Sequence, residues 1–195
     1  MPEAPLALPR REDLEQRTVS FLNHGNSRNP DVYLIAAGER QVVVKDFLPR
    51  GWWIRSTWGR FSIWNEMATY RALADHPSVP TLIGPVDELA FVVEYRPGQR
   101  MTRRLRGRVS AEFPDELARA IRDMHEQGVI HLDLRHRSNV MVGEDGHPVL
   151  IDFASAIRFR PGSWAHRWIM PLLSWIDMGA LRKWQDRLTR DRWAT

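Results

Sequence analysis

The sequence predicts an α+β chain in two parts, a small sheet with one helix followed by a mainly helical part. Runs with β-forming residues and turn signals occupy residues 18–47 and 81–95. Apolar residues at helical spacing separate these runs, and a second helical pattern and a hairpin pattern follow residue 97. The chain has 195 residues, which is about one domain of typical size or one domain built as two lobes.

Composition narrows the classes of protein. The apolar fraction is 43% and nine residues are Trp, which indicates a folded chain rather than a disordered one. The absence of Cys excludes disulfides, Cys-ligated zinc, iron–sulfur clusters and thiol nucleophiles, and it suits a reducing compartment. The formal charge is +4, and a basic C-terminal half permits an anionic partner. Nucleic acid is not the expected partner, because no recognised reader motif accompanies the charge.

The first part is predicted in three pieces. Residues 1–17 are rich in proline and charge and predict an N-terminal arm, and residues 18–96 are predicted to form an N-terminal lobe. Residues 48–60 contain Gly and three Trp and are interpreted as an ordered loop, and residues 61–74 are predicted to form an amphipathic helix. The strands of this lobe are expected at 18–23, 32–37, 41–47, 81–86 and 89–95.

Residues 97–195 are predicted to form the second, smaller part. Its arginine-rich start, residues 99–112, is interpreted as a connector, and the run 101–109 within it as a solvated segment rather than a binding patch. A helix is expected from Pro114, since proline suits the first turn of a helix. The Asp145-Gly146 pair lies between short β-forming runs and predicts a hairpin. Residues after Gly162 are expected to form one or two helices rich in Trp and Arg.

Four features then follow one another in a fixed order. Lys45 lies in a strand (VVVKDF), Glu66 lies in the next helix (WNEMATY), and a loop reads HLDLRHRSN over residues 131–139. Asp152 and Phe153 end the last predicted strand. This set resembles the protein-kinase-like superfamily, whose signature joins a strand lysine, a helix glutamate, an H-x-D…N loop and a D-F motif. The resemblance implies a two-lobed protein-kinase-like α+β fold with a minimal C-terminal lobe.

The resemblance also implies ATP and a divalent cation as cofactors. Lys45 would hold the α and β phosphates and Glu66 would orient it. Glu94 and Tyr95 would belong to the hinge segment whose backbone meets adenine. Asn139 and Asp152 offer the hard oxygen ligands that Mg²⁺ or Mn²⁺ prefers.

The same loop would carry the chemistry of transfer. Asp133 would take the proton of an acceptor hydroxyl or orient that hydroxyl. Arg135 corresponds to the cation that stabilises the transferring phosphoryl group. His131 is interpreted as a structural residue that supports the backbone by a hydrogen bond.

Four departures from the family pattern separate this chain from ordinary protein kinases. The phosphate loop keeps only Gly25, and Asn26, Ser27 and Arg28 are the candidates to replace its glycines. Asp133 and Asn139 are one residue further apart than usual, and Ala154 stands where the pattern has Gly. Only 43 residues follow Asp152 and they contain no A-P-E segment.

The short second lobe resembles small bacterial kinases of the RIO type and of the lipopolysaccharide-core sugar type. The stretch from Asp177 to Lys183 resembles their D-x-x-A-L-x-K helix. The acceptor would then be a hydroxyl of a lipid-linked sugar, and a protein Ser or Thr is the alternative. A catalytically inactive pseudokinase that only binds is the alternative of another class, because the phosphate loop is poor in glycine.

Localisation follows from weaker signals. The N-terminus lacks the pattern of a signal peptide, and the apolar run 168–176 is too short to cross a bilayer, so a cytoplasmic protein is expected. Trp and Arg side chains are concentrated in residues 158–195, which suits peripheral contact with an anionic inner-membrane surface. The slightly preferred alternative is that these tryptophans pack the small second lobe.

Overall fold

The computed structural model describes residues 8–105 and 107–189. Contacts between Cα atoms divide the described chain into two compact units. The first holds the residues up to Ala68 together with Thr81–Tyr95, and the second holds Thr69–Pro80 and the residues from Arg96 on. Residues 69–80 thus belong to the second unit, whereas the sequence interpretation placed them in the N-terminal lobe. Each unit is described by itself.

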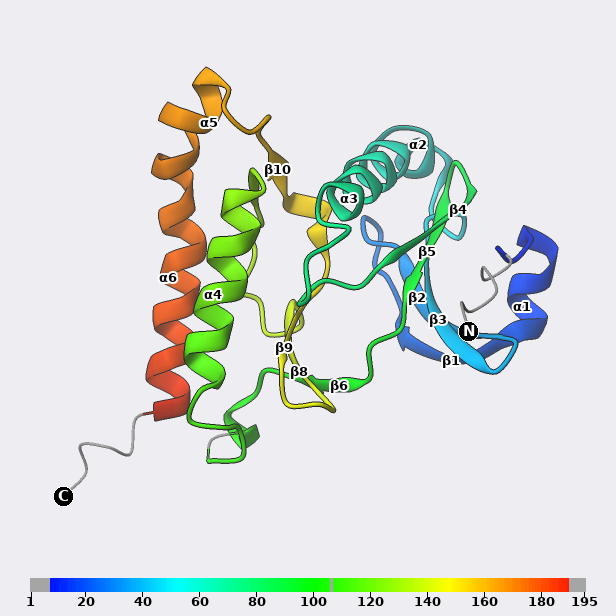
Figure 1. Ribbon diagram of the computed structural model, residues 1–195. Helices are drawn as coiled ribbons and strands as arrows, with labels where there is room; N and C mark the ends of the chain where they lie inside the picture. Colours follow the sequence, from blue (N-terminus) through cyan, green and yellow to red (C-terminus); the bar gives the residue numbers. More distant parts are fainter. Residues whose placement is uncertain (1–7, 106, 190–195) are drawn as a thin grey trace, which may run out of the picture. The chain divides into compact units, whose positions relative to one another are not determined.

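A five-stranded antiparallel sheet forms the first unit (Figure 1), in the order β1-β2-β3-β5-β4. Ile35, Val44 and Val92 are fully buried on its covered face, because alternate residues of a strand point to the same side. The expected strands are all present. Their bounds are β1 Thr18–Asn23, β2 Asp31–Ala37, β3 Arg40–Asp46, β4 Leu82–Asp87 and β5 Ala90–Glu94.

The segment before this sheet is held more firmly than the expected arm. It contains the 3₁₀ turn η1 (Arg11–Asp13) and the short helix α1 (Leu14–Arg17). Leu14 is buried in the core of the unit, and Arg11 forms ion pairs with Asp46 and, at 2.6 Å, with Asp87. Burial alone would raise the pKa of Asp87, but hydrogen bonds from Arg11 and from a backbone amide outweigh it and lower that pKa.

The loop predicted over residues 48–60 is wrong from Trp52 onward. Helix α2 (Trp52–Ile54), a π-helical turn η2 (Arg55–Gly59) and helix α3 (Arg60–Ala72) follow one another without a break. Gly59 lies inside the helical segment because a Cβ there would come within 3.1 Å of the Phe47 ring. This glycine allows close packing instead of marking a turn, and the neighbouring exposed tryptophans hide the helical period.

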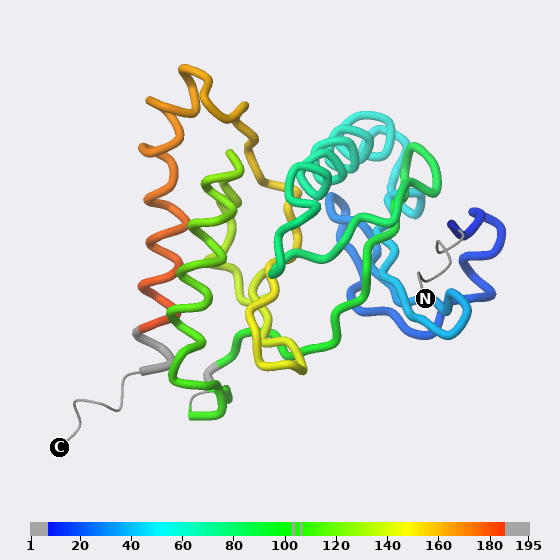
Figure 2. Tube along the Cα trace, viewed as in Figure 1, coloured from blue at the N-terminus to red at the C-terminus, as the bar shows by residue number. Residues whose placement is uncertain are grey.

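Two long helices dominate the second unit: α4 (Phe113–Glu126) and α6 (Met170–Thr189), which pack against each other (Figure 2). Helix α4 buries Leu117, Ile121 and Met124, as its spacing predicts. The short helix α5 (Trp164–Trp168) precedes α6. No helix in the described part of the chain is long and apolar enough to span a bilayer.

Short strands and turns make up the rest of the second unit. The expected hairpin is present as β8–β9, with a left-handed glycine, Gly146, in its turn. Strand order is β6-β8-β9 in one small sheet and β10-β7 in the other. The bounds are β6 Gly98–Arg100, η3 Arg103–Leu105, β7 Val129–Ile130, β8 Val140–Gly143, β9 Pro148–Leu150, η4 Phe153–Ser155 and β10 Ile157–Arg158.

Candidate active site

A buried ion pair lies in the first unit. Lys45 is on β3, opposite Val32 and Phe91 of the neighbouring strands, and Glu66 is on α3. The Lys45 Nζ donates to Glu66 Oε1 at 2.5 Å, and both side chains are buried. Removing two charges from water is costly, so a pair of this kind indicates a role beyond stability. The structure therefore brings together the two residues that the sequence pattern linked.

The turn between β1 and β2 is closed on itself. The side-chain oxygen of Asn26 accepts hydrogen bonds from the amides of Arg28 (2.9 Å) and Asn29 (3.1 Å), and the Gly25 amide donates to Asp31 (2.8 Å). Arg50 donates to the Gly25 carbonyl at 3.2 Å and pairs with Asp31. Backbone amides that could contact phosphates in a glycine-rich loop are here used inside the turn.

The predicted hinge residues end the first unit. Glu94 is the last residue of β5, and its backbone and side chain both bond to Thr81, with the Thr81 amide 2.9 Å from Glu94 Oε2. Tyr95 follows and is half-buried. The Glu94 carboxylate thus fixes the start of β4.

The loop of residues 131–139 forms two consecutive turns in the second unit. The His136 amide donates to the Asp133 carbonyl and the Asn139 amide donates to the His136 carbonyl, each at 3.2 Å. These turns accommodate the additional residue, because Asn139 Nδ2 still reaches Asp133, at 2.9 Å from Oδ2 and 3.0 Å from the carbonyl oxygen. Arg135 is exposed in the same loop.

Main-chain hydrogen bonds of the preceding residue, Ile151, hold Asp152 beside that loop. The Ile151 amide donates to the Asn139 carbonyl at 3.1 Å, and His131 Nε2 is 3.0 Å from the Ile151 carbonyl. His131 thus has the structural role predicted for it, and its ring lies 4.7 Å from that of Phe153. Asp152 has a φ of 67°, so the left-handed residue of this motif is the aspartate and Ala154 needs no such conformation.

The donor groups at this place fit a magnesium or manganese ion. Asn139 directs its Nδ2 at Asp133, and its amide oxygen accepts a hydrogen bond from Ser138 Oγ at 3.0 Å. This oxygen, which has a second lone pair, and the Asp152 carboxylate are hard oxygen donors on neighbouring chain segments. Within the described ranges no cluster of three or more His, Asp or Glu residues is suited to a metal. Mg²⁺ needs no such cluster, since it keeps several waters and takes one or two protein oxygens beside substrate phosphates.

Helix α6 holds the loop through its main chain. Asp177 is fully buried, and its two oxygens accept hydrogen bonds from the amides of His131 (2.8 Å) and Leu132 (2.9 Å). His125 Nε2 on α4 lies 3.0 Å from the same carboxylate. In the sequence, Asp177 is recognisable only as part of a family motif, so its role in holding the loop could not be predicted from the residues alone.

The same helix contacts the next two carbonyls of the loop. Trp184 Nε1 donates to the Leu134 carbonyl at 2.9 Å, and Lys183 donates to the Arg135 carbonyl. Lys183 is one of only two lysines beside 26 arginines, and this contact gives it a structural role. Trp184 is buried, as the packing interpretation of the tail expected. The preferred interpretation is wrong for the other described tryptophans of the tail, which are 61–69% exposed: Trp164, Trp168 and Trp175.

Comparison with known proteins decides the family. The protein kinase domain family matches residues 34–170. The chain belongs to this family. Its kinase relatives in Arabidopsis thaliana include the serine/threonine-protein kinase OXI1, 32% identical over 45% of this chain and 23% of that protein. Serine/threonine-protein kinase KIPK1 is 34% identical over 44% of this chain, which spans 10% of that protein.

A solved kinase structure has the same fold. It is a Rio2 kinase from Chaetomium thermophilum in complex with ADP, Mg²⁺ and a phosphoaspartate. The similarity has a TM-score of 0.60 at 16% identity and covers 94% of this chain and 60% of that one. The protein-kinase-like fold and its resemblance to the RIO type are thereby confirmed, while the share of the curated relatives that this chain spans stays below a third.

Proposed function

We propose that the protein transfers the γ-phosphoryl group of ATP to a hydroxyl acceptor with a divalent cation as cofactor. The observation that carries this proposal is the contact of Asn139 with Asp133 beside Asp152. A base, an amide oxygen and a carboxylate close to one another support phosphoryl transfer, which needs positioned groups and little covalent chemistry from the protein.

Each residue has a specific part in this proposal. Lys45, oriented by Glu66, binds the α and β phosphates, and the backbone near Glu94 and Tyr95 meets adenine. A compact ammonium suits this buried position, where a planar guanidinium fork is harder to accommodate.

The second unit supplies the groups for the transfer step. Asn139 and Asp152 would hold the cation, which supplies neutralisation of phosphate charge when it is bound. An oxygen of the Asp133 carboxylate accepts the proton of the acceptor hydroxyl, while Asn139 Nδ2 holds Oδ2 of that carboxylate in place. Arg135 is exposed and contributes positive charge near the transferred group.

Two acceptors remain in the proposal. The names of the relatives favour a protein Ser or Thr. The likeness to RIO-type kinases also favours protein, whereas the short second lobe and its resemblance to lipopolysaccharide-core kinases favour a sugar hydroxyl on a lipid-linked glycan. Labelled γ-phosphate is followed from ATP into fractionated cell contents, with Asp133→Asn as the blank. Label in glycolipid supports the sugar acceptor and label in protein supports Ser or Thr, whereas no label above the blank contradicts phosphoryl transfer.

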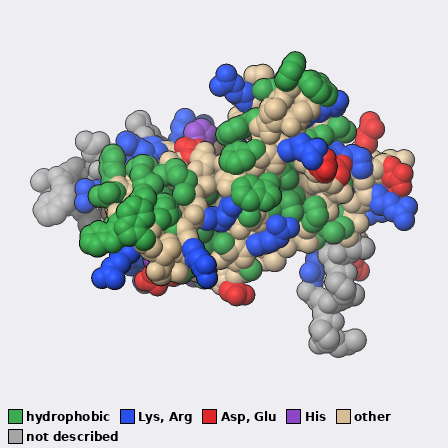
Figure 3. Space-filling model, turned by 90° about the horizontal axis from the view of Figure 1, so that it is seen from above, with side chains coloured by type: hydrophobic (Ala, Val, Ile, Leu, Met, Phe, Trp, Pro, Cys, Tyr) green, Lys and Arg blue, Asp and Glu red, His purple; other side chains and the backbone are tan. Residues whose placement is uncertain are grey.

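Peripheral contact with an anionic membrane, at the cytoplasmic face, belongs to the same proposal. Helices α5 and α6 expose Trp164, Trp168 and Trp175 together with Leu172, at spacings that follow successive helical turns. Residues 153–176 contain three arginines and no acidic residue. Exposed Trp beside Arg suits the headgroup region of a bilayer. Figure 3 shows green hydrophobic side chains and blue basic ones side by side on the face seen from above.

Vesicle flotation tests the membrane contact. We expect the protein to float with vesicles that contain anionic phospholipid and to stay behind with neutral ones. Replacing Trp164, Trp168 and Trp175 by Ser should abolish flotation. A variant with Trp52 and Trp53 replaced by Ser is the control for a general loss of apolar surface, and an equal loss in both variants contradicts the assignment to α5 and α6.

A further inference from the structure

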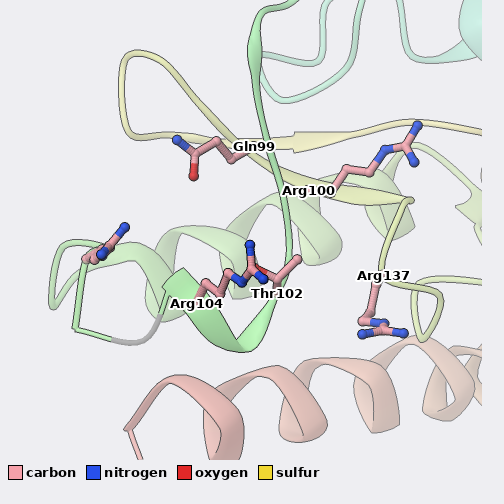
Figure 4. Close-up of a pocket in the computed structure, with 6 residues that line it drawn as sticks. Gln99, Arg100, Thr102, Arg104 and Arg137 are labelled. Carbon is pink, nitrogen blue, oxygen red and sulfur yellow. The ribbon is translucent and has the colours of Figure 1, made fainter. Parts of the chain in front are cut away.

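An arginine-lined hollow of about 720 Å³ lies in the second unit (Figure 4). Its side chains come from β6, from η3 with the residues on either side of it, and from the loop that follows Asp133. Among the described residues that line it, none is acidic. Its volume is in the range of pockets that hold small molecules. The lining residues are Gln99, Arg100, Thr102, Arg104, Arg108 and Arg137.

Two buried residues anchor the segment that carries most of these arginines, although the arginines themselves are exposed as expected of a connector. Met101 is fully buried and its amide donates to the Val140 carbonyl at 3.0 Å. Leu105 is also buried, and its amide donates to the Thr102 carbonyl at 3.1 Å. The Arg108 amide then donates to the Leu105 carbonyl at 2.9 Å. Buried apolar residues therefore alternate with arginines and fix the side of the chain that faces the hollow.

The charge of this hollow calls for an anion. Four of the six lining residues are arginines, and their positive charge attracts an anion. The planar guanidinium fork matches the oxygens of a phosphate group and can form two parallel hydrogen bonds to it. Thr102 and Gln99 add neutral groups that hydrogen-bond to hydroxyls.

The hollow is connected to the proposed catalytic loop through Arg137, which lies four residues after Asp133. Asp177, Lys183 and Trp184 fix the main chain of that loop. We propose that the hollow binds a phosphate monoester carried by the acceptor, so that the substrate is a phosphorylated sugar, either free or lipid-linked. This inference rests on the proposed function, because only a phosphoryl transferase has an acceptor. Binding of the phosphate group to the hollow can nevertheless be measured without transfer.

Calorimetry with glucose 6-phosphate tests the binding. All proteins carry Lys45→Ala, which removes the proposed phosphate contact of the nucleotide site. Arg104→Gln with Arg108→Gln should weaken the affinity at least ~10-fold, since hydrogen bonds to charged groups are the strong ones. Arg119→Gln, an exposed arginine of α4 that does not line the hollow, is the matched control. Equal affinity in all three proteins, or an equal loss in the control, overturns the site.

The charge of the ligand gives a second measurement. A phosphate monoester loses its second negative charge near pH 6, whereas sulfate keeps both charges. Affinity for glucose 6-phosphate should therefore fall between pH 7.5 and pH 5.5, while the affinity for sulfate stays constant. No binding of glucose 6-phosphate above that of glucose contradicts the proposal.

The transfer assay distinguishes the sources of the phosphate. Each cell fraction is treated with a phosphatase, which is then removed, before labelled ATP and the protein with intact Lys45 are added. Loss of labelling in the water-soluble fraction indicates a free sugar phosphate, and loss in the glycolipid fraction indicates a lipid-linked one. Labelling of protein that is insensitive to the phosphatase overturns the inference. Absence of transfer with intact binding contradicts the proposed function alone.

Discussion

Leu132 and Asp152 both have a φ of 67°, a backbone conformation that side chains other than glycine rarely adopt. Each lies at the proposed site, one before Asp133 and the other at the candidate metal position. Such residues persist only when their surroundings hold them, and they are concentrated at functional sites. For Leu132 the holding group is visible: Asp177 Oδ1 accepts the hydrogen bond of its amide.

Asp177→Asn tests this support. One oxygen replaces two, so one of the amides at His131 and Leu132 is left facing an NH₂ group. A buried donor without an acceptor costs about 1–3 kcal/mol, and the catalytic loop loses its position. We expect a lower kcat with an unchanged KM for ATP, measured together with urea unfolding. Unchanged kcat at reduced stability would limit Asp177 to a purely structural role.

The order of motifs predicted which residues meet. Lys45 and Glu66 are in contact as their positions in the pattern suggested, whereas the contact of Asn139 with Asp133 was not predicted. The role of Asp177 had no such signal, because a carboxylate that bonds to main-chain amides 45 and 46 residues away leaves no trace in the residue types that it contacts.

At the scale of elements, His76 links the segment after α3 to α4. Its Nε2 lies 2.9 Å from the Ala120 carbonyl and its Nδ1 accepts a hydrogen bond from the Ser78 amide at 3.2 Å. A carbonyl only accepts and an amide only donates, so the neutral ring with hydrogen on Nε2 satisfies both partners. Burial lowers the pKa of His76 below its ordinary value.

The stability of this link should depend on pH. A folded-state pKa below the unfolded value of about 6.5 means that the unfolded chain binds the proton more readily. The contribution of His76 is therefore complete above that pH and is lost as pH falls through it. Urea unfolding at pH 7.5 and 5.5 should show a smaller decrease for His76→Gln than for the wild type. Equal decreases contradict a neutral buried His76.

Element prediction succeeded where burial is periodic and failed where it is not. Helix α4 has one buried face and was found from its spacing. The helical segment from Trp52 was missed because its aromatic residues face solvent and its glycine, Gly59, serves close packing against Phe47. Likewise, the anchoring of the arginine-rich segment after β6 was missed, since its buried Met101 and Leu105 are too few to form a recognisable pattern.

At the scale of the whole molecule, nucleotide binding distinguishes a kinase from a pseudokinase that no longer binds ATP. ATP with Mg²⁺ at 100 times its dissociation constant should stabilise the fold by about 2.7 kcal/mol, which raises Tm by roughly 5–10 °C for a chain of this size. Asp152→Ala should abolish the shift and Arg119→Gln should leave it intact. The test matters because the Gly25 amide is used inside its own turn and is not available to a phosphate. An unchanged Tm of the wild type with ATP and Mg²⁺ would favour the pseudokinase.

The fold as a whole could be predicted because the family signature extends through most of the chain, from the strand of Lys45 to the motif of Asp152. The division of the chain was harder. Residues 69–80 include the end of α3, and local sequence gives no sign that their packing partners lie in the second unit, where Tyr70 meets Phe153 at 5.2 Å.

The contacts of α6 with the catalytic loop have an evolutionary consequence. Asp177, Lys183 and Trp184 all bond to main-chain atoms of that loop, which every residue type except proline presents in full. The exposed positions between Asp133 and Asn139 can therefore change by mutation while the course of the loop is inherited intact. Under the proposed function, single substitutions at these exposed positions would change the acceptor specificity, while the contacts from α6 keep the main chain of the loop in place.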